Sequence, residues 1–271
     1  MRCEGILLSD GVKRTDENVC SEDSVFVWGS GEFGCLGTNS TSQHPSPFAL
    51  SLFAKKNVIQ VAAGFKYSIV VCASGDVYAW GINEHGQLGE VSDQMVEGMK
   101  CALQPVQIES LCDESIIMVS CGWRHVVALN DNGVLFAWGS NEHGQLGLGS
   151  VDPMCVPPTE LTQLFGEAIS EIACGSSHTL ALSAESREVY SWGKGEEGRL
   201  GHGDTESRNR PTLIRALAPL RIQHISAGWA HSAAVVAGTG ELYCWGRGEC
   251  TGTGNRSHVL TPVEIPDIYN V

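Results

Sequence analysis

The strongest constraint on this fold is a stretch of about thirteen residues that recurs five times along the 271-residue chain. The copy at 77–89 reads VYAWGINEHGQLG. Every copy contains a Trp-Gly pair, and the tryptophans are Trp28, Trp80, Trp138, Trp192 and Trp245. Successive tryptophans lie 52, 58, 54 and 53 residues apart. A period of this length indicates an array of repeated supersecondary units.

A second marker runs in phase with the first. It reads ISAGWAHSAAV at 225–235, and its glycines are Gly64, Gly122, Gly175 and Gly228, spaced 58, 53 and 53 residues apart. A histidine follows three residues after the last three of these glycines, at His125, His178 and His231, whereas Tyr67 follows the first. Two markers with one period strengthen the prediction of a repeat protein, and we expect the repeated Trp, Gly and His residues to be structural.

Each repeat has the pattern of four short strands. Two apolar strands are joined by the glycine marker, a hairpin turn leads to the Trp-Gly strand, and a glycine-rich turn and a longer loop precede the last strand. Four antiparallel strands per repeat, arranged radially, predict an all-β fold of the β-propeller type. Complete repeats span 58–109, 116–162, 169–216 and 222–265, and a half repeat spans 25–53.

Smaller features complete the prediction of the fold. The last strand of each repeat is expected to start after a proline: Pro105, Pro157-Pro158, Pro211 and Pro262. Helical periodicity is weak, with its best candidate at 159–165. Residues 1–24 carry no repeat marker and are expected to form a flexible tail before a propeller domain at 25–271. Alternatively, residues 6–8 lend a strand to a sheet edge.

Composition narrows the classes of function. With 31 acidic and 17 basic residues, the net charge is −14, which disfavours direct binding to nucleic acids or anionic membranes. No apolar run is long enough to cross a membrane, and the N-terminus lacks the apolar region of a signal peptide. Eleven cysteines without a CxxC motif indicate a reduced protein. We therefore expect an intracellular location, cytoplasmic, nuclear or both.

The candidate chemical sites are better explained as repeat positions. Segments 29–34 and 193–198 fit the pattern GxGxxG, but no helix is expected after them, so we interpret their glycines as turn residues and expect no cofactor. The three repeated histidines are expected to hydrogen-bond within their own repeats and to bind no metal. Glutamates recur at one equivalent position in the turns of several repeats, so we interpret them as turn residues. No catalytic residue is expected.

The two markers resemble the regulator of chromosome condensation repeat family over residues 25–265. The second marker matches best at 172–182 and 225–235, and the departures are Tyr67 in place of histidine, Thr251 in place of glycine and Thr253 in place of leucine. The resemblance implies a ring of seven four-stranded blades. Because this chain has fewer than seven repeats, we expect an incomplete ring. Three explanations stay open: the chain is a truncated form, it pairs with another chain, or its ring is smaller than that of the family.

The resemblance also suggests two functions. The first is a non-enzymatic protein-interaction or regulatory propeller. The alternative is a guanine-nucleotide exchange factor for a Ran-like small GTPase, which would act by stabilising the nucleotide-free GTPase. The loops differ in length between repeats, and the longest one, 90–104, is therefore the favoured binding element. It is also the candidate for the wedge element that would insert into a GTPase. The predicted partner-binding residues are Asp93, Glu97, Trp123, Arg124 and Trp229.

A photoreceptor branch of the family carries Gly-Trp-Arg-His in consecutive blades. Here that motif occurs once, at 122–125. The corresponding dipeptides elsewhere are Phe65-Lys66, Ser176-Ser177 and Trp229-Ala230. Because a light-absorbing cluster needs several such tryptophans, we do not expect a photoreceptor.

Overall fold

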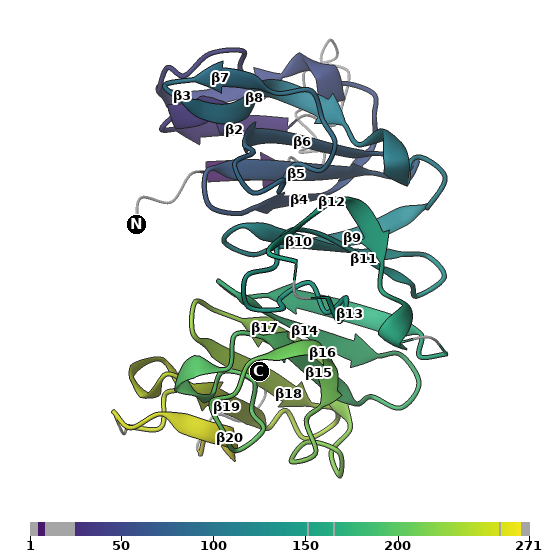
Figure 1. Ribbon diagram of the computed structural model, residues 1–271, viewed down its shortest axis with the longest axis vertical. Coiled ribbons are helices and arrows are strands. Elements are labelled where there is room, and N and C mark those ends of the chain that lie inside the picture. The colour runs from purple at the N-terminus through teal and green to yellow at the C-terminus, as the bar shows by residue number, and fades with distance from the viewer. Residues whose placement is uncertain (1–4, 9–24, 151, 165, 255, 267–271) are drawn as a thin grey trace, which may run out of the picture. The chain divides into compact units, whose positions relative to one another are not determined.

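The computed structural model describes residues 5–8, 25–150, 152–164, 166–254 and 256–266, almost all of them in strands and turns (Figure 1). The chain forms two compact units, Met1–Val119 and Ser120–Val271, which are described separately below. Among the described residues, no helix is long and apolar enough to cross a lipid bilayer.

The first unit contains two antiparallel sheets. One has the strand order β1-β2-β3 and the other has the order β4-β5-β6-β8-β7. Their strands are β1 (Gly5–Leu8), β2 (Val25–Gly29), β3 (His44–Leu50), β4 (Val58–Ala63), β5 (Tyr67–Cys72), β6 (Val77–Ile82), β7 (Gln94–Val96) and β8 (Met99–Gln107).

The second unit contains three four-stranded antiparallel sheets, ordered β12-β11-β10-β9, β13-β14-β15-β16 and β17-β18-β19-β20. The strands are β9 (Ile116–Cys121, which crosses the division at Val119), β10 (His125–Asn130), β11 (Leu135–Ser140), β12 (Met154–Glu160), β13 (Ile169–Cys174), β14 (His178–Ser183), β15 (Val189–Gly193), β16 (Arg208–Leu213), β17 (Ile222–Ala227), β18 (His231–Val236), β19 (Leu242–Gly246) and β20 (Val259–Glu264).

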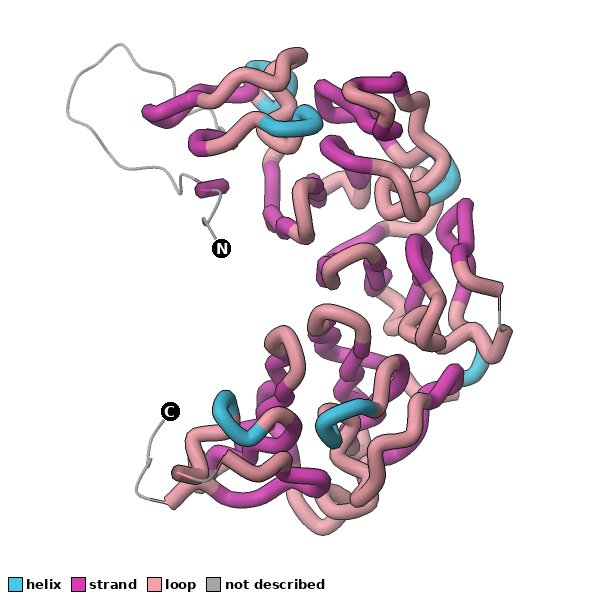
Figure 2. The backbone as a smooth tube through the Cα atoms, turned by 60° about the vertical axis from the view of Figure 1, so that its left-hand side comes forward, coloured by secondary structure: helices cyan, strands magenta, loops and turns pink. Residues whose placement is uncertain are grey.

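Among the described residues, helical structure is confined to short 3-10 turns, drawn in cyan in Figure 2. These are η1 (Glu32–Gly34), η2 (Ser51–Phe53), η3 (Glu109–Leu111), η4 (Thr162–Leu164), η5 (Glu196–Gly198) and η6 (Gly248–Cys250). At the weak helical candidate, 159–165, the chain remains in β12 as far as Glu160 and then makes one short 3-10 turn at η4.

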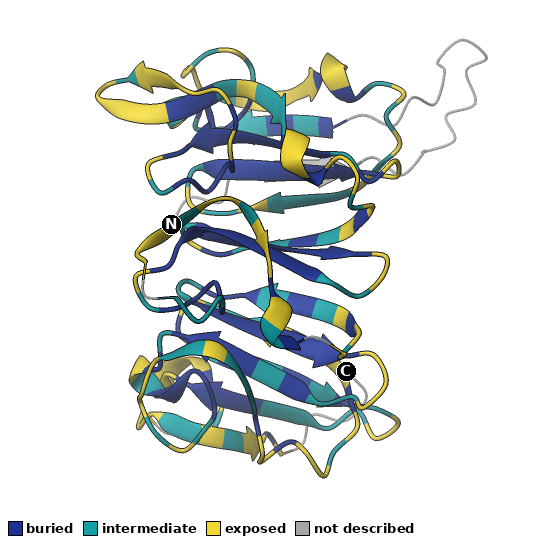
Figure 3. Cartoon of the chain, turned by 45° about the vertical axis from the view of Figure 1, so that its right-hand side comes forward, coloured by how far each residue is buried: buried dark blue, intermediate teal, exposed yellow. Residues whose placement is uncertain are grey.

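Burial follows the position of each strand in its sheet. Every residue of β5, β6, β10, β11 and β14 is buried, whereas β3, β12 and β20 are largely exposed (Figure 3). These five strands are buried on both faces and therefore consist of near-continuous apolar runs. Trp80, Trp138, Trp192 and Trp245 are fully buried, whereas Trp28 is half-buried.

The Trp-Gly pair has a specific backbone role. Gly81 has φ +104°, and the pairing of β6 with β8 shifts register between Ala79 and Gly81, which marks a β-bulge. A side chain on Gly81 would collide with the carbonyl oxygen of Lys66. Only glycine meets both demands easily, which explains why glycine follows tryptophan in all five copies.

The predicted all-β fold of antiparallel sheets is confirmed, and each predicted repeat coincides with one sheet. The prolines lie inside the outer strands rather than before them: β12 contains Pro157 and Pro158, β16 contains Pro211 and β20 contains Pro262. An outer strand has neighbours on one side only, so a missing N–H there costs no ladder bond.

Two segments differ from the simplest prediction. Residues 94–107, within and just beyond the predicted long loop, form the β7–β8 hairpin, which adds a fifth strand to its sheet. At the N-terminus, β1 pairs antiparallel with β2, as in the alternative in which residues 6–8 join a sheet edge. Most of the expected tail, at 1–4 and 9–24, lies outside the described residues.

Candidate functional site

Two kinds of loop meet at one end of the sheets in the second unit. The glycine-marker loops, 122–124, 175–177 and 228–230, join the first and second strands of each sheet. The turns after the Trp-Gly pairs lie beside them: Ser140 N donates to Arg124 O, Lys194 N to Ser177 O and Arg247 N to Ala230 O, each at 2.8 Å. We call this end of the second unit the loop end.

Each glycine marker is a packing motif. A Cβ on Gly175 would collide with the imidazole of His178 and with the carbonyl oxygen of Gly228. Glycine at this position therefore lets the histidine ring fold back onto the backbone three residues earlier. The first unit uses the same arrangement with a different ring, since Tyr67 packs on Gly64.

Two of the three repeated histidines, His125 and His178, bond to the neighbouring sheet, which corrects the expectation that they bond within their own repeats. His125 Nε2 lies 3.1 Å from Thr179 Oγ1, and His178 Nε2 lies 2.9 Å from Ser232 Oγ. Both rings face the next sheet, where the hydroxyl groups of Thr179 and Ser232 are fully buried. Burial lowers the pKa of His125 to about 3 and that of His178 well below its ordinary value, so both rings are neutral.

Each of those hydroxyls continues to a carbonyl in a glycine-rich turn. Thr179 Oγ1 donates to Gln145 O and Ser232 Oγ donates to Arg199 O, both at 2.9 Å. The same two carbonyls accept the indole N–H groups of Trp192 and Trp245, also at 2.9 Å. These repeated residues therefore hold neighbouring sheets together and are not available as metal ligands.

The loop end brings together three of the residues predicted to bind a partner. The rings of Trp123 and Trp229 are 5.7 Å apart between centroids and inclined at 63°, in edge-to-face contact. They remain 37% and 56% exposed. The guanidinium carbon of Arg124 lies 5.3 Å from the centre of the Trp123 ring, a cation–π distance.

The backbone beneath the tryptophan pair is tied across three sheets. Trp123 N donates to Ser176 O at 3.1 Å, and Ser176 Oγ donates to Trp229 O at 2.6 Å. Arg199, only 4% exposed, donates to the same Trp229 carbonyl at 3.3 Å and pairs with Glu197 at 2.7 Å. The loops are therefore fixed before any partner arrives.

Ser176, Glu197 and Arg199 are parts of this site that sequence reasoning did not identify. The available signal was a departure within the repeat: Arg199 occupies the position held by Gln87 and Gln145 in other copies. A long cation at a position where two other copies have glutamine indicates a local partner, which the structure identifies as Glu197.

The other two predicted residues, Asp93 and Glu97, lie in the first unit. Asp93 accepts a hydrogen bond from Asn83 Nδ2 at 3.1 Å and so anchors the loop before β7. Glu97 and Gly98 form the two-residue turn of the β7–β8 hairpin, with φ +51° and +80°. Met95 flanks that turn and is 65% exposed.

An exposed aromatic side chain also occupies the glycine-marker loop of the first unit. Phe65, directly after Gly64, is 41% exposed. The ammonium group of the next residue, Lys66, lies 4.6 Å from the Phe33 ring centre and 2.7 Å from Glu32 Oε2, and it lowers the pKa of that carboxyl. Phe65 occupies the same repeat position as Trp123 and Trp229.

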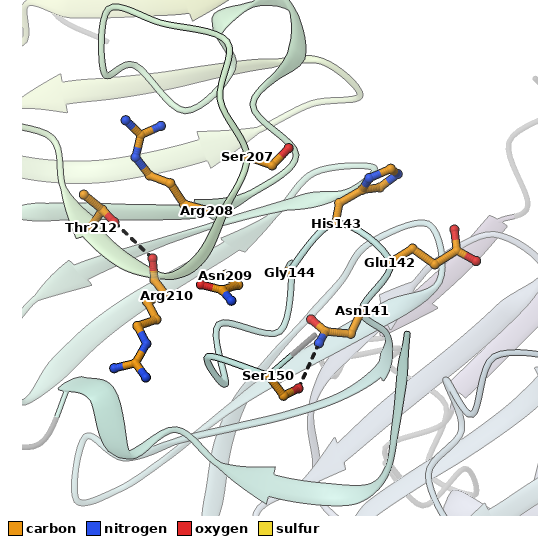
Figure 4. A pocket seen from close by; sticks show the side chains of 10 residues that line it. All are labelled: Asn141, Glu142, His143, Gly144, Ser150, Ser207, Arg208, Asn209, Arg210 and Thr212. Carbon is orange, nitrogen blue, oxygen red and sulfur yellow. Dashed lines mark hydrogen bonds between the residues drawn. The ribbon is translucent and has the colours of Figure 1, made fainter. Parts of the chain in front are cut away.

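An open polar groove of about 520 Å³ lies between the 141–150 turn and β16 (Figure 4). Its two walls are braced internally, by Asn141 Nδ2 donating to Ser150 Oγ at 3.3 Å and by Thr212 Oγ1 donating to Arg210 O at 3.1 Å.

In the described part of the chain, no group of three or more His, Cys, Asp or Glu side chains is placed to hold a metal ion.

Comparison with known proteins gives concordant matches. The family model of the RCC1-like domain matches residues 18–271. The chain is 34% identical to the ultraviolet-B receptor UVR8 of Arabidopsis thaliana over 253 residues, which are 91% of this chain and 55% of that protein. It is 33% identical to the human E3 ubiquitin-protein ligase HERC2 over 247 residues, 88% of this chain and 5% of that protein.

Solved structures also match. The structure of Prp20p from Saccharomyces cerevisiae, described with its binding to Gsp1p and histones, is 27% identical, with a TM-score of 0.77 over 90% of this chain and 59% of that one. Human WBSCR16 shares the fold, with a TM-score of 0.80 at 23% identity over 97% of this chain and 65% of that one. The chain thus spans less than two thirds of the length of each of these proteins.

Proposed function

Because the chain belongs to the family of RCC1-like domains, we propose that it is a non-enzymatic, regulatory protein-binding module. Its binding site in this proposal is the loop end of the second unit, centred on Trp123 and Trp229. The observation that carries the proposal is that these two large aromatic side chains are exposed side by side on loops that are hydrogen-bonded to one another.

Three physical arguments support this site. Tryptophan and arginine dominate the binding energy of protein interfaces, and both occur here in contact. Large apolar side chains exposed together on a soluble protein mark interaction surfaces. The Trp123–Ser176–Trp229 backbone bonds hold the loops in place, so that little conformational entropy is lost when a partner binds.

The test is affinity purification of the tagged chain from cell lysate, comparing wild type with Trp229→Ala. Val263→Ala is the matched control, because Val263 is 43% exposed on the outer strand β20. We expect the partners to be lost with Trp229→Ala and retained with Val263→Ala. Partners retained equally by both variants would place the binding site elsewhere.

A second candidate is guanine-nucleotide exchange on a Ran-like small GTPase, with the β7–β8 hairpin as the contacting element. The hairpin is an addition to its sheet, and Met95 and Met99 are 65% and 37% exposed beside the Glu97-Gly98 turn. Flexible methionine side chains adapt well to a partner surface. The related Prp20p structure is described with binding to Gsp1p, which supports a GTPase partner by similarity.

Exchange is tested by purifying partners with and without EDTA, which removes Mg²⁺ and favours nucleotide-free GTPases. We expect a small GTPase enriched only with EDTA, and lost when Met95 and Met99 are both changed to serine. The purified pair should then release bound nucleotide faster with the wild-type chain than with the double variant. A partner set without GTPases under both conditions contradicts this candidate and leaves the first one standing.

A further inference from the structure

Three contacts between neighbouring sheets share one arrangement. A carbonyl in the glycine-rich turn of one sheet accepts an indole N–H and a hydroxyl from the next sheet. The carbonyls and their donors are Cys35 with Trp80 and Ser68, Gln145 with Trp192 and Thr179, and Arg199 with Trp245 and Ser232. The glycine two residues after each carbonyl lies against the indole, since a Cβ there would be 2.7–2.9 Å from its nitrogen.

The β17–β20 sheet presents the same accepting arrangement, and no described residue of the second unit is docked in it. By repeat position, Gly252 supplies the carbonyl and Gly254 supplies the glycine under the indole. Both are exposed, and nothing lies within 4 Å of a Cβ built on either. In the described part of the chain, neither His231 Nε2 nor the buried His231 Nδ1 makes a hydrogen bond.

The apolar surface around this site is also partly exposed among the described residues. Ala233, Val235 and Leu242 are half-buried, whereas their counterparts in the neighbouring sheet are Leu180, Leu182 and Val189, each with an exposure of 0% beneath the β17–β20 sheet. We call the surface made by His231, Ala233, Val235, Leu242, Gly252 and Gly254 the Gly252 socket.

The chain also carries a side chain of the type that fits this socket. In β2, Val25 and Val27 are fully buried in a cluster with Trp80. Side chains alternate along a strand, so Phe26 and Trp28 face the other way, and both are half-buried. Among the described residues, the indole N–H of Trp28 donates no hydrogen bond, unlike those of Trp80, Trp192 and Trp245.

We propose that the Gly252 socket binds the β1–β3 sheet of a second copy of this chain. The Trp28 indole of that copy lies on Gly254 and donates to the Gly252 carbonyl, while its Phe26 covers Val235. The two surfaces differ, so the contact is heterologous and joins copies head to tail, into a closed ring or a filament. This self-assembly surface is separate from the tryptophan pair of the proposed function.

The contact lacks some features of the three contacts within the chain. Thr251 occupies the repeat position that Gly198 holds in the neighbouring sheet. Gly198 packs beneath Leu260 of the following sheet. Gly5 pairs with Trp28, at the position where Ser232 pairs with Trp245, so His231 receives no hydroxyl from the second copy. We therefore expect association that reverses on dilution.

The test is sedimentation of the full chain over a range of concentrations. The wild-type mass is expected to rise with concentration above the 29.0 kDa of the monomer. Val235→Arg places a charge in the socket and Trp28→Ala removes the inserted side chain, so each variant alone should remain monomeric. Val263→Arg, the same change at an exposed position of β20, should associate like wild type.

Mixing the two variants gives the decisive measurement. The Trp28→Ala chain retains an intact socket and the Val235→Arg chain retains Trp28, so one contact is possible between them. The mixture should form a dimer that grows no further. Circular dichroism checks that both variants fold. A wild-type chain that is monomeric at every concentration, or a mixture that stays monomeric, overturns the proposal, as does association that only Trp229→Ala abolishes.

Discussion

The imidazole Nε2 of His178 lies 2.9 Å from Ser232 Oγ on the neighbouring sheet, and that hydroxyl donates to the Arg199 carbonyl at 2.9 Å. Ser232→Ala leaves the buried His178 Nε2 without its partner and removes one of the two donors to the Arg199 carbonyl, which also accepts the Trp245 indole N–H. We expect this loss to lower the free energy of unfolding by about 1–3 kcal/mol. Urea unfolding followed by circular dichroism measures the change. Ser226→Ala, at an exposed position of β17, should leave the unfolding midpoint unchanged, and equal effects of the two substitutions would contradict this interpretation.

The indole nitrogens offer a comparison between two positions of one motif. Trp245→Phe removes a fully buried indole whose N–H donates to Arg199 O, and the loss of that bond together with the cavity should cost about 2–4 kcal/mol. Trp28→Phe changes a half-buried side chain whose indole N–H donates no hydrogen bond to a described residue, so it should cost less. Thermal unfolding of the two variants ranks them, and a reversed order would show that the indole bonds between sheets contribute little.

The buried histidines make stability depend on pH in one direction. The folded-state pKa of His125, about 3, and that of His178 both lie below the ordinary value of 6.5, so the unfolded chain takes up protons first. Their contribution is complete above pH 6.5 and is lost as the pH falls toward 3, at about 1.4 kcal/mol per pH unit for each ring. Urea midpoints at pH 7, 6 and 5 should fall accordingly.

Replacing one ring isolates this effect from the titration of carboxylates. His178→Asn is expected to be less stable at pH 7 but to lose less stability between pH 6.5 and 5 than wild type. Parallel slopes for wild type and His178→Asn would rule out the buried ring as the source.

A glycine substitution tests the packing of the glycine marker. In Gly175→Ala the new methyl group meets the His178 ring and the Gly228 carbonyl, so we expect a loss above about 3 kcal/mol or failure to fold. In Gly238→Ala the methyl group meets nothing within 4 Å, and the penalty comes only from φ +82°, about 1 kcal/mol. Soluble yield and the melting temperature of the two variants separate collision from backbone strain.

The repeat could be read from the sequence because its markers are local. The bulge at Gly81 and the ring packed on Gly175 each involve residues within a few positions or on adjacent strands, so residue type and spacing carry the information. The target of His178 could not be read in this way. Ser232 lies 54 residues further along, and only the stacking of two sheets brings the pair together.

The long loop was predicted as a binding element but not as a hairpin. Its Glu97-Gly98 pair, between short apolar segments, is a turn signal, but only three residues precede it in β7, too few for a clear alternating pattern. The approach of Trp123 to Trp229 was beyond sequence reasoning for a different reason. Their loops belong to sheets that are not consecutive, and Ser176 in the intervening sheet lets the two rings meet.

The sharing of each turn carbonyl between one sheet and the indole of the next bears on how such a chain changes length during evolution. Cys35, Gln145 and Arg199 differ in side chain, but it is the backbone carbonyl of each that receives the indole N–H. If one whole period is duplicated or deleted, each indole N–H therefore still meets a turn carbonyl of the preceding sheet. This holds wherever in the repeat the duplication or deletion begins. An insertion or deletion of any other length separates an indole N–H from its carbonyl. The number of sheets can therefore change by whole periods, whereas changes by a fraction of a period are selected against.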